Sequence, residues 1–139
     1  MSRPETPLLT VDAVILYESD KLVLIRRKNP PYQGELAIPG GFVDIGETVE
    51  NACIREAREE TNLNVKINNL IGVFSDPKRD PRGHTVTIAF LCEPADKKSK
   101  PKAQDDAAAL EIIPLSKISS LTLAFDHLEI IKASGILPE

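Results

Sequence analysis

The sequence lacks any long apolar run, any excess of positive charge and any close pair of cysteines. Its apolar stretches fall well short of the roughly 20 residues that a membrane-spanning helix needs, and residues 1–7 lack the apolar core of a secretion signal. The 17 basic and 21 acidic residues give a net charge of −4, whereas general nucleic-acid binding needs a basic surface. We therefore expect a cytoplasmic protein that binds neither membranes nor nucleic acid.

The two cysteines, Cys53 and Cys92, both stand in apolar stretches. Their separation does not match the closely spaced ligands of a zinc site. A free cysteine usually packs as a small apolar side chain. We therefore favour two reduced, buried thiols over a disulfide or a catalytic thiol.

The chain of 139 residues has the size of one compact domain. Apolar residues at 42% and charged residues at 27% are ordinary for a globular protein. No internal repeat and no linker-like segment divides the chain. We expect one domain over residues 1–139, in which residues 1–7 form a flexible tail.

Strand and helix patterns alternate along the chain. Strands are predicted where apolar and β-branched residues gather between turn signals, at 9–17, 21–27, 34–41, 85–92 and 109–115, with one kinked strand or a short pair at 65–75. Helices are predicted at 48–61 and 122–134, and loops at 76–83 and 93–108. This order predicts an α+β fold, a mixed β-sheet between helices with a helix on each face, in other words an α/β/α sandwich.

The helix predicted at 48–61 has recognisable ends. Thr48 is a good N-cap residue. Asn62 is a plausible stop, because asparagine tolerates the left-handed conformation at a helix end. The second predicted helix has Gly135 as its C-terminal cap.

Carboxylates are concentrated on the apolar side of the first helix. At about 100° per residue, Glu56 and Glu60 fall on the apolar stripe and Glu59 lies at its edge. Like charges at these spacings repel, by roughly 4 kcal/mol for about 4 Å and an effective dielectric of about 20. A divalent cation would turn this repulsion into binding, and oxygen ligands suit Mg²⁺ or Mn²⁺.

A solvated acidic helix face, paired with Arg55 and Arg58, is the alternative interpretation. The turn before the helix favours a binding site instead. Pro39-Gly40-Gly41 brings backbone without side chains close to the helix start, where carbonyls can reach a metal and N–H groups can reach a phosphate.

The residues from 41 to 63 resemble the Nudix box. The match is carried, in order and with the family's spacing, by Gly41, Glu47, Arg55-Glu56-Ala57, Glu59-Glu60 and Asn62-Leu63. The family usually has glycine at the place of Asn62, and asparagine can adopt the same backbone conformation. Ala57 is smaller than the aliphatic residue usual at its position.

Outer segments resemble the ADP-ribose pyrophosphatase subgroup of this family. They are residues 40–44, residues 75–84 with the strand that follows, and residues 123–127, and Pro77 lies fifteen residues past Asn62 as in that subgroup. The same segments occur in Nudix regulators that also carry a winged DNA-binding domain. Because this chain ends at Glu139, we expect it to lack that second domain.

The resemblance implies hydrolysis of a nucleoside diphosphate linked to another group, with Mg²⁺ or Mn²⁺ as cofactor. It assigns catalysis and metal binding to Glu56, Glu59 and Glu60, with the carbonyl of Gly40 as a further metal ligand. Such ions neutralise developing charge and activate a water that attacks phosphorus in line. Arg55 and Glu47 are expected to support the site.

The general base is assigned by position alone. Relatives often supply a carboxylate from the loop after the box, and the candidates here are Asp105, Asp106 and Glu111. Asp106 is our choice. The subgroup often has glutamate where this chain has Ala109, so a weakly placed base or a base from the box is an alternative. Ordinary loop roles for Asp105 and Asp106 are an equal alternative.

Four further residues are candidates for contact with the substrate. Arg79 and Arg82 could clamp phosphates through paired hydrogen bonds, and a solvated loop is the alternative. Aromatic residues make up only 4% of the chain, and Phe42 and Tyr32 flank the glycine turn, which makes them candidates for contact with the nucleotide base. His127 is expected to cap or brace the last helix.

The leading functional hypothesis is hydrolysis of ADP-ribose, a small-molecule nucleotide, to AMP and ribose 5-phosphate. Two alternatives stay open: a pyrophosphohydrolase that removes damaged nucleoside triphosphates, and a non-catalytic nucleotide sensor. The intact acidic positions of the box argue against the sensor. A homodimer is a further expectation, since relatives of this subgroup often dimerise.

Overall fold

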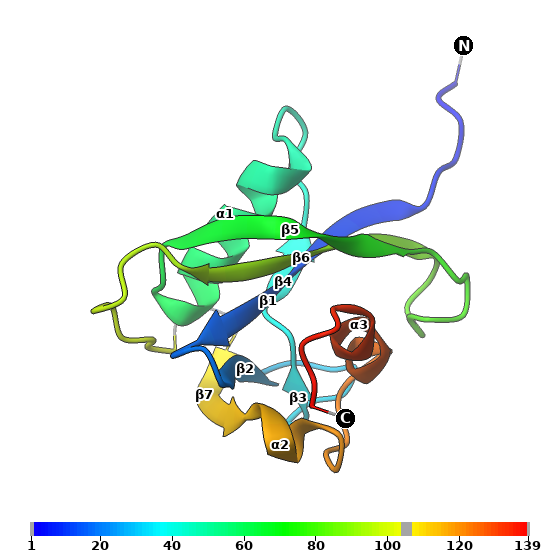
Figure 1. Ribbon diagram of the computed structural model, residues 1–139. Helices are drawn as coiled ribbons and strands as arrows, with labels where there is room; N and C mark the ends of the chain where they lie inside the picture. The colour runs from blue at the N-terminus through cyan, green and yellow to red at the C-terminus, as the bar shows by residue number, and fades with distance from the viewer. Residues whose placement is uncertain (1, 104–106, 139) are drawn as a thin grey trace.

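The computed structural model describes residues 2–103 and 107–138 (Figure 1). Its elements are β1 (Leu8–Tyr17), β2 (Lys21–Arg27), β3 (Leu36–Ala37), β4 (Gly40–Phe42), α1 (Val49–Thr61), β5 (Val65–Phe74), β6 (Thr85–Pro94), β7 (Ala107–Pro114), α2 (Leu115–Ile118) and α3 (His127–Ala133). The strands join in one sheet whose main path runs β3-β2-β1-β6-β5. Strand β4 also pairs with β1, and β7 pairs with β2.

The sheet is mixed, as predicted. Strands β1 and β6 run parallel over eight paired positions, whereas β1 is antiparallel to β2 and β4. The parallel pair lies at the centre, and its long connection contains β2, β3, β4, α1 and β5, since parallel strands need a long crossover. Figure 1 shows α1 and α3 on opposite sides of this sheet.

The two faces of β1 pack against different helices. Val11, Ala13 and Ile15 belong to a buried cluster that contains residues of α1. Val14 belongs to a second cluster, built with residues of α3. Because side chains alternate along a strand, Asp12 points to the same face as Val14. The prediction of an α+β sandwich with a helix on each face is therefore confirmed.

The ends of α1 follow the prediction. The side chain of Thr48 accepts a hydrogen bond from the backbone N–H of Asn51 at 3.1 Å, which caps the first turn. Asn62 has φ 63° and ψ 13°, the left-handed conformation that ends the helix. The thiols of Cys53 and Cys92 are buried, free and 3.8 Å apart, so their prediction is also confirmed.

Several elements differ from the predictions. The strand predicted at 34–41 is two short strands, β3 and β4. The last helix begins at His127 and not at residue 122, because Leu123 bridges to Leu36 and the N–H of Ala124 donates to the Leu36 carbonyl at 2.8 Å. The short helix α2 was not predicted. Strand β7 starts at residue 107, so the preceding loop is shorter than expected. Strand β5 is a single strand with an irregular register, one of the two forms left open.

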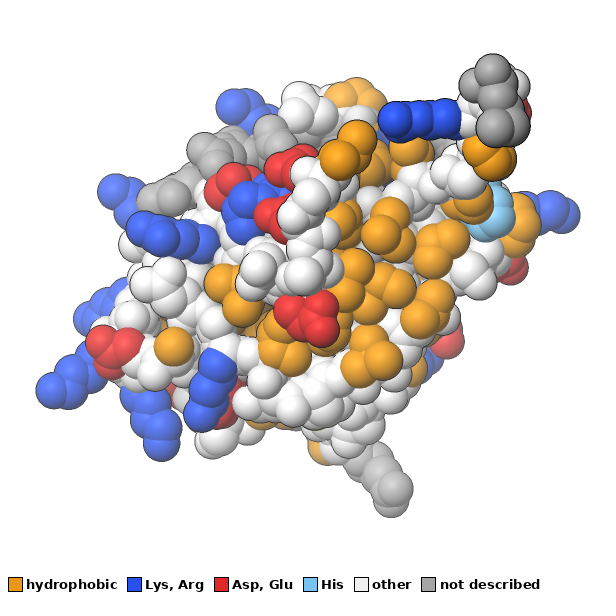
Figure 2. Space-filling view, turned by 90° about the horizontal axis from the view of Figure 1, so that it is seen from above, with side chains coloured by type: hydrophobic (Ala, Val, Ile, Leu, Met, Phe, Trp, Pro, Cys, Tyr) orange, Lys and Arg blue, Asp and Glu red, His pale blue; other side chains and the backbone are white. Residues whose placement is uncertain are grey.

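No helix among the described residues is long and apolar enough to cross a membrane. Exposed large apolar side chains occur on β1 and β5, among them Leu8, Leu70 and Val73. Figure 2 shows apolar side chains gathered on the face seen from above, beside a mixed group of acidic and basic side chains.

Candidate active site

A cavity of about 430 Å³ is lined by residues of β1, β4, α1, the loop before β6 and the start of α3. Its volume lies within the usual range for small-molecule sites. The residues predicted from the sequence that line it are Gly40, Phe42, Glu56, Glu60, Arg79 and Arg82. Residues that were not predicted as site residues also line it, among them Asp12, Arg27, Asp80, Phe125 and His127.

The glycine turn of the box fits closely around neighbouring groups. A Cβ atom on Gly41 would lie 2.5 Å from an oxygen of the Glu56 carboxylate. A Cβ atom on Gly40 would collide with the carbonyl oxygen of Val11 and with Oδ1 of Asp12. A side chain at either position would collide with these oxygens, which explains why both positions are glycine.

Arg55 connects the acidic residues of the box. Its guanidinium donates two hydrogen bonds to Glu47, at 2.7 and 2.9 Å, and one to Glu56 at 2.7 Å. It also donates to the carbonyl of Phe42 at 3.0 Å, which ties α1 to β4. The hydrogen bonds from Arg55 lower the pKa of Glu47 to about 2. These contacts fit the supporting role expected for Arg55 and Glu47.

Of the three glutamates assigned to the metal, two line the cavity. Glu56 and Glu60 line the cavity with Gly40, and Glu60 is 5% exposed. Glu59 does not line it and accepts a hydrogen bond from Arg55 at 3.1 Å. Within residues 2–103 and 107–138, no three His, Cys, Asp or Glu side chains form a group that could hold a metal ion. The oxygens of Glu56 and Glu60 and the Gly40 backbone remain a donor set of the kind Mg²⁺ prefers.

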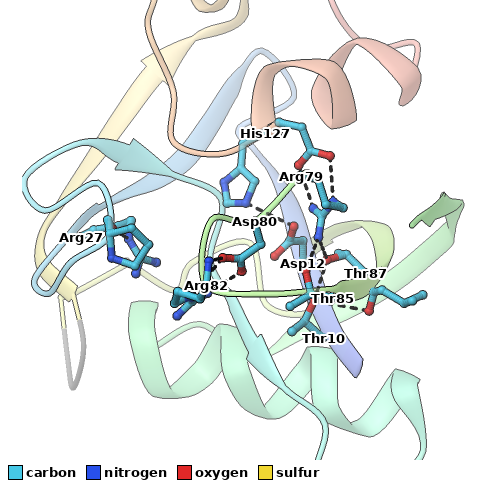
Figure 3. A network of polar contacts seen from close by, with 12 residues as sticks. Thr10, Asp12, Arg27, Arg79, Asp80, Arg82, Thr85, Thr87 and His127 are labelled. Carbon is cyan, nitrogen blue, oxygen red and sulfur yellow. Dashed lines mark hydrogen bonds and ion pairs between the residues drawn. The ribbon is translucent and has the colours of Figure 1, made fainter. Parts of the chain in front are cut away.

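Arg79 is anchored beneath the cavity (Figure 3). Its guanidinium pairs with Asp126 through hydrogen bonds of 2.8 and 2.7 Å, and Nη1 donates to Thr85 and Thr87 at 3.0 and 2.6 Å. Its side chain is 6% exposed. The two hydrogen bonds to Asp126 fasten the loop before β6 to the start of α3, and the other two fasten it to β6. The phosphate contact predicted for Arg79 stays a prediction.

Arg82 lies at the open side of the cavity. Its guanidinium pairs with Asp80 and is 46% exposed. Its Cζ atom lies 5.5 Å from the ring centre of Phe125 and 5.9 Å from that of Phe42, within cation–π distance. Burial opposes ionisation of Asp80, but the hydrogen bonds from Arg82 keep the pKa of that carboxyl below its ordinary value.

Two aromatic residues at this entrance have unusual backbone conformations. Tyr32 has φ 58° and Phe125 has φ 52°, a region that bulky residues rarely occupy. Their rings pack with centres 4.8 Å apart, and Arg27 stacks on Phe125 at 4.9 Å. Phe125 and Phe42 face the cavity, whereas Tyr32 contacts Phe125 from outside it. Tyr32 thus reaches the cavity only through Phe125.

Asp12 and His127 meet on the floor of the cavity (Figure 3). The backbone N–H of Ile38 donates to Nδ1 of His127 at 2.9 Å, so the ring proton lies on Nε2, which is 3.4 Å from Oδ2 of Asp12. Burial raises the pKa of Asp12 to about 7 and lowers that of His127 to about 3. His127 braces the segment before the glycine turn and is not a helix cap.

The predicted general base cannot be placed. Asp105 and Asp106 lie outside the described residues. Glu111 does not line the cavity, and its carboxylate accepts a hydrogen bond from Nε of Arg26 on the neighbouring strand.

The model of the NUDIX domain family matches residues 6–133. The chain belongs to the Nudix family. The chain is 47% identical over 126 residues to an ADP-ribose pyrophosphatase of Methanocaldococcus jannaschii, a match that covers 91% of this chain and 72% of that one. The family resemblance seen in the box is therefore confirmed.

Solved Nudix structures share the fold. The NUDIX domain of Shewanella oneidensis NrtR, complexed with ADP ribose, superposes with a TM-score of 0.81 and 28% identity, covering 94% of this chain and 88% of that one. A bifunctional NMN adenylyltransferase/ADP ribose pyrophosphatase of Francisella tularensis, complexed with AMP and a manganese ion, gives 0.82 and 32%, covering 94% and 42%. The chain spans 62% of another solved Nudix relative and 52% of another curated relative.

The unpredicted residues of this Nudix site left different signals in the sequence. Asp12 is an acidic residue inside the apolar strand pattern of residues 11–17, and a buried charge in such a strand is a signal of function. Phe125 and His127 were noticed as part of a family-like segment but were not assigned to the cavity. Only tertiary packing brings that segment against β4.

Proposed function

We propose that this Nudix protein hydrolyses ADP-ribose, with water, to AMP and ribose 5-phosphate, and that Mg²⁺ is its metal. The proposal is carried by one observation. A single cavity holds two carboxylates of the box, the half-exposed guanidinium of Arg82 and the rings of Phe42 and Phe125. These groups match a metal-bound diphosphate at one end and a flat base at the other.

The donor set supports a divalent metal at the box. Glu56, Glu60 and the backbone carbonyl of Gly40 would hold the ion, because hard cations prefer such oxygens. A bound ion neutralises charge on the phosphate oxygens and makes a bound water more acidic. Asp106 as the general base remains part of the proposal, and a pair of variants described below tests whether Glu59 binds the metal directly.

The protein's own side chains would hold the substrate in place. Arg82 is half exposed at the cavity, so its guanidinium can contact a phosphate oxygen. The rings of Phe42 and Phe125 flank that guanidinium and offer flat surfaces to a base. Arg55 keeps the carboxylates of Glu47 and Glu56 in fixed positions.

Turnover of a substrate panel tests the proposal. The purified protein is given Mg²⁺ and, in parallel, ADP-ribose, NADH, diadenosine polyphosphates and 8-oxo-dGTP, and the products are separated by chromatography. We expect ADP-ribose to have the highest kcat/KM and to yield AMP. Preference for a triphosphate would overturn the proposed substrate but would leave the proposed hydrolase activity in place. Absence of turnover would favour a nucleotide sensor.

A pair of variants tests whether Glu60 and Glu59, both on α1, have different roles at the metal site. Glu60→Gln is expected to lower kcat by more than about 100-fold, a larger loss than the removal of an outer partner of a metal site causes. Glu59→Gln is the matched control on the same helix, and we expect about 10-fold because its carboxylate contacts Arg55 outside the cavity. Equal losses in the two variants would place Glu59 at the metal.

A cytoplasmic location and a homodimer are further parts of this proposal. The apolar surface in Figure 2 gives a second copy of the chain a place to pack. Sedimentation of the purified protein tests the dimer directly.

A further inference from the structure

Asp12 is a buried acceptor that faces the cavity. Its side chain is less than a tenth exposed and lines the cavity floor. Among the residues that the structure describes, Oδ2 of Asp12 receives no hydrogen bond. A buried acceptor without a donor costs about 1–3 kcal/mol, so a folded protein rarely keeps one without a reason.

Neither Arg79 nor His127 donates a hydrogen bond to Oδ2 of Asp12. Arg79 donates to Asp126, Thr85 and Thr87. Nε2 of His127 comes no closer to Oδ2 than 3.4 Å, and its ring is fixed by the hydrogen bond from Ile38. The acceptor therefore remains available to a donor that enters the cavity.

The chemistry of the substrate decides which group can be that donor. Phosphate oxygens of a diphosphate are acceptors and repel a carboxylate. Ribose hydroxyls donate, and each ribose of ADP-ribose is joined directly to a phosphate. Asp12 Oδ1 lies against Gly40, whose turn borders the carboxylates of the box, so a ribose beside the bound diphosphate comes within reach of Asp12.

We propose that Asp12 is a specificity residue that accepts a hydrogen bond from a ribose hydroxyl of the substrate. The proposal rests on the proposed function only in its choice of ADP-ribose. A carboxylate that binds a ribose hydroxyl is well established chemistry in nucleotide-binding proteins. The carboxylate of Asp12 would also repel the diphosphate from this part of the cavity floor, and so orient the substrate.

Calorimetric binding of the two products, in the presence of Mg²⁺, tests the proposal without turnover. One arm compares ribose 5-phosphate with 2-deoxyribose 5-phosphate, and the other compares AMP with 2′-deoxy-AMP. We expect the wild-type protein to prefer the hydroxylated ligand about tenfold in one arm, the value of one good hydrogen bond. The arm that responds identifies which ribose Asp12 contacts.

The variant Asp12→Asn, which replaces one of the two acceptor oxygens with a donor NH₂ and removes the charge, is expected to bring that ratio close to one. Asp12→Ala should do the same, and a ratio within one variant does not depend on how much of it is folded. The matched control Asp44→Asn removes the same charge from a largely exposed position at the cavity, and it should keep the tenfold ratio.

Three results would overturn the proposal. They are a wild-type protein that does not discriminate in either arm, an Asp12→Asn variant that keeps the wild-type ratio, and an Asp44→Asn variant that loses it. A preference for AMP over IMP that is lost in Asp12→Asn would instead place the adenine amino group on Asp12. Failure to hydrolyse ADP-ribose would leave these ratios interpretable, because they do not use turnover.

Discussion

Arg79 and Arg82 stand three residues apart on one loop and occupy opposite environments. Arg79 is buried and reaches Asp126, far along the chain, whereas half-exposed Arg82 pairs with Asp80 two residues away. The long-range pair fastens the loop to the body of the protein. The local pair leaves its guanidinium at the cavity. The same residue type thus anchors the loop in one position and, in the proposed function, contacts the substrate in the other.

The largest effect that this comparison predicts is the loss of stability in Arg79→Met. The change leaves the Asp126 carboxylate without its paired donor, and we expect the free energy of unfolding to fall by about 3 kcal/mol. Urea denaturation measures it. Arg82→Met, the matched variant on the same loop, should cost less, about 1.5 kcal/mol, because the buried Asp80 carboxylate keeps the hydrogen bond from the backbone N–H of Arg82. Equal losses of stability in the two variants would show that Arg79 does not anchor the loop more strongly than Arg82.

The second prediction concerns binding and reverses the roles. Arg82→Met removes a guanidinium from the cavity mouth, so the KM for ADP-ribose should rise about tenfold, or about 1.4 kcal/mol, while kcat changes little. Steady-state kinetics under conditions where the variant is fully folded measures both constants. An unchanged KM would show that Arg82 serves the loop alone.

The third prediction concerns how the stability of the protein depends on pH through Asp12 and His127, the two buried groups close to Arg79. Burial raises the pKa of Asp12 to about 7, so its contribution to stability falls as the pH rises from about 4 to 7. Burial lowers the pKa of His127 to about 3, so its contribution increases as the pH rises from about 3 to 6.5. The two slopes oppose each other.

Asp12→Asn removes only the falling slope. The stability of this variant relative to wild type should therefore rise by about 1.4 kcal/mol for each pH unit between about pH 4 and 7. Urea denaturation at several pH values, with EDTA to exclude metal, measures the slope. Parallel pH profiles for the two proteins would show that Asp12 has an ordinary pKa.

The smallest expected effect comes from Thr87→Val, which removes one acceptor of Arg79 and should cost about 1 kcal/mol. A double-mutant cycle sharpens the comparison. The variant that carries both Thr87→Val and Arg79→Met should lose less stability than the sum of the two single losses, because the two side chains share a hydrogen bond. The effects of Thr87→Val and Arg82→Met should simply add.

Local signals in the sequence predicted the elements that local physics controls. Thr48 and Asn62 mark the ends of α1 through their own side-chain and backbone preferences, and the fixed spacing of the box places Glu56 and Glu60 on one helix. The site residues that come from this helix could therefore be predicted.

Residues whose role depends on distant partners could not be predicted in the same way. Arg79 looks like Arg82 in the sequence, and only its pairing with Asp126 separates them. The start of α3 was placed too early because residues 123 and 124 join β3 through backbone contacts, which override helix propensity. Asp12 left a signal as a charge in an apolar strand, but its place on the cavity floor depends on tertiary packing.

The hydrogen bond from Ile38 to His127 has a consequence for the order in which the chain is made. It joins the strand that leads into the glycine turn to a segment that the ribosome produces about 90 residues later. Residues of the box are all synthesised before this partner exists. A nascent chain that stops short of Phe125 therefore carries every carboxylate of the box and still has an incomplete floor and entrance, so activity should appear only after residues 125–127 have been made.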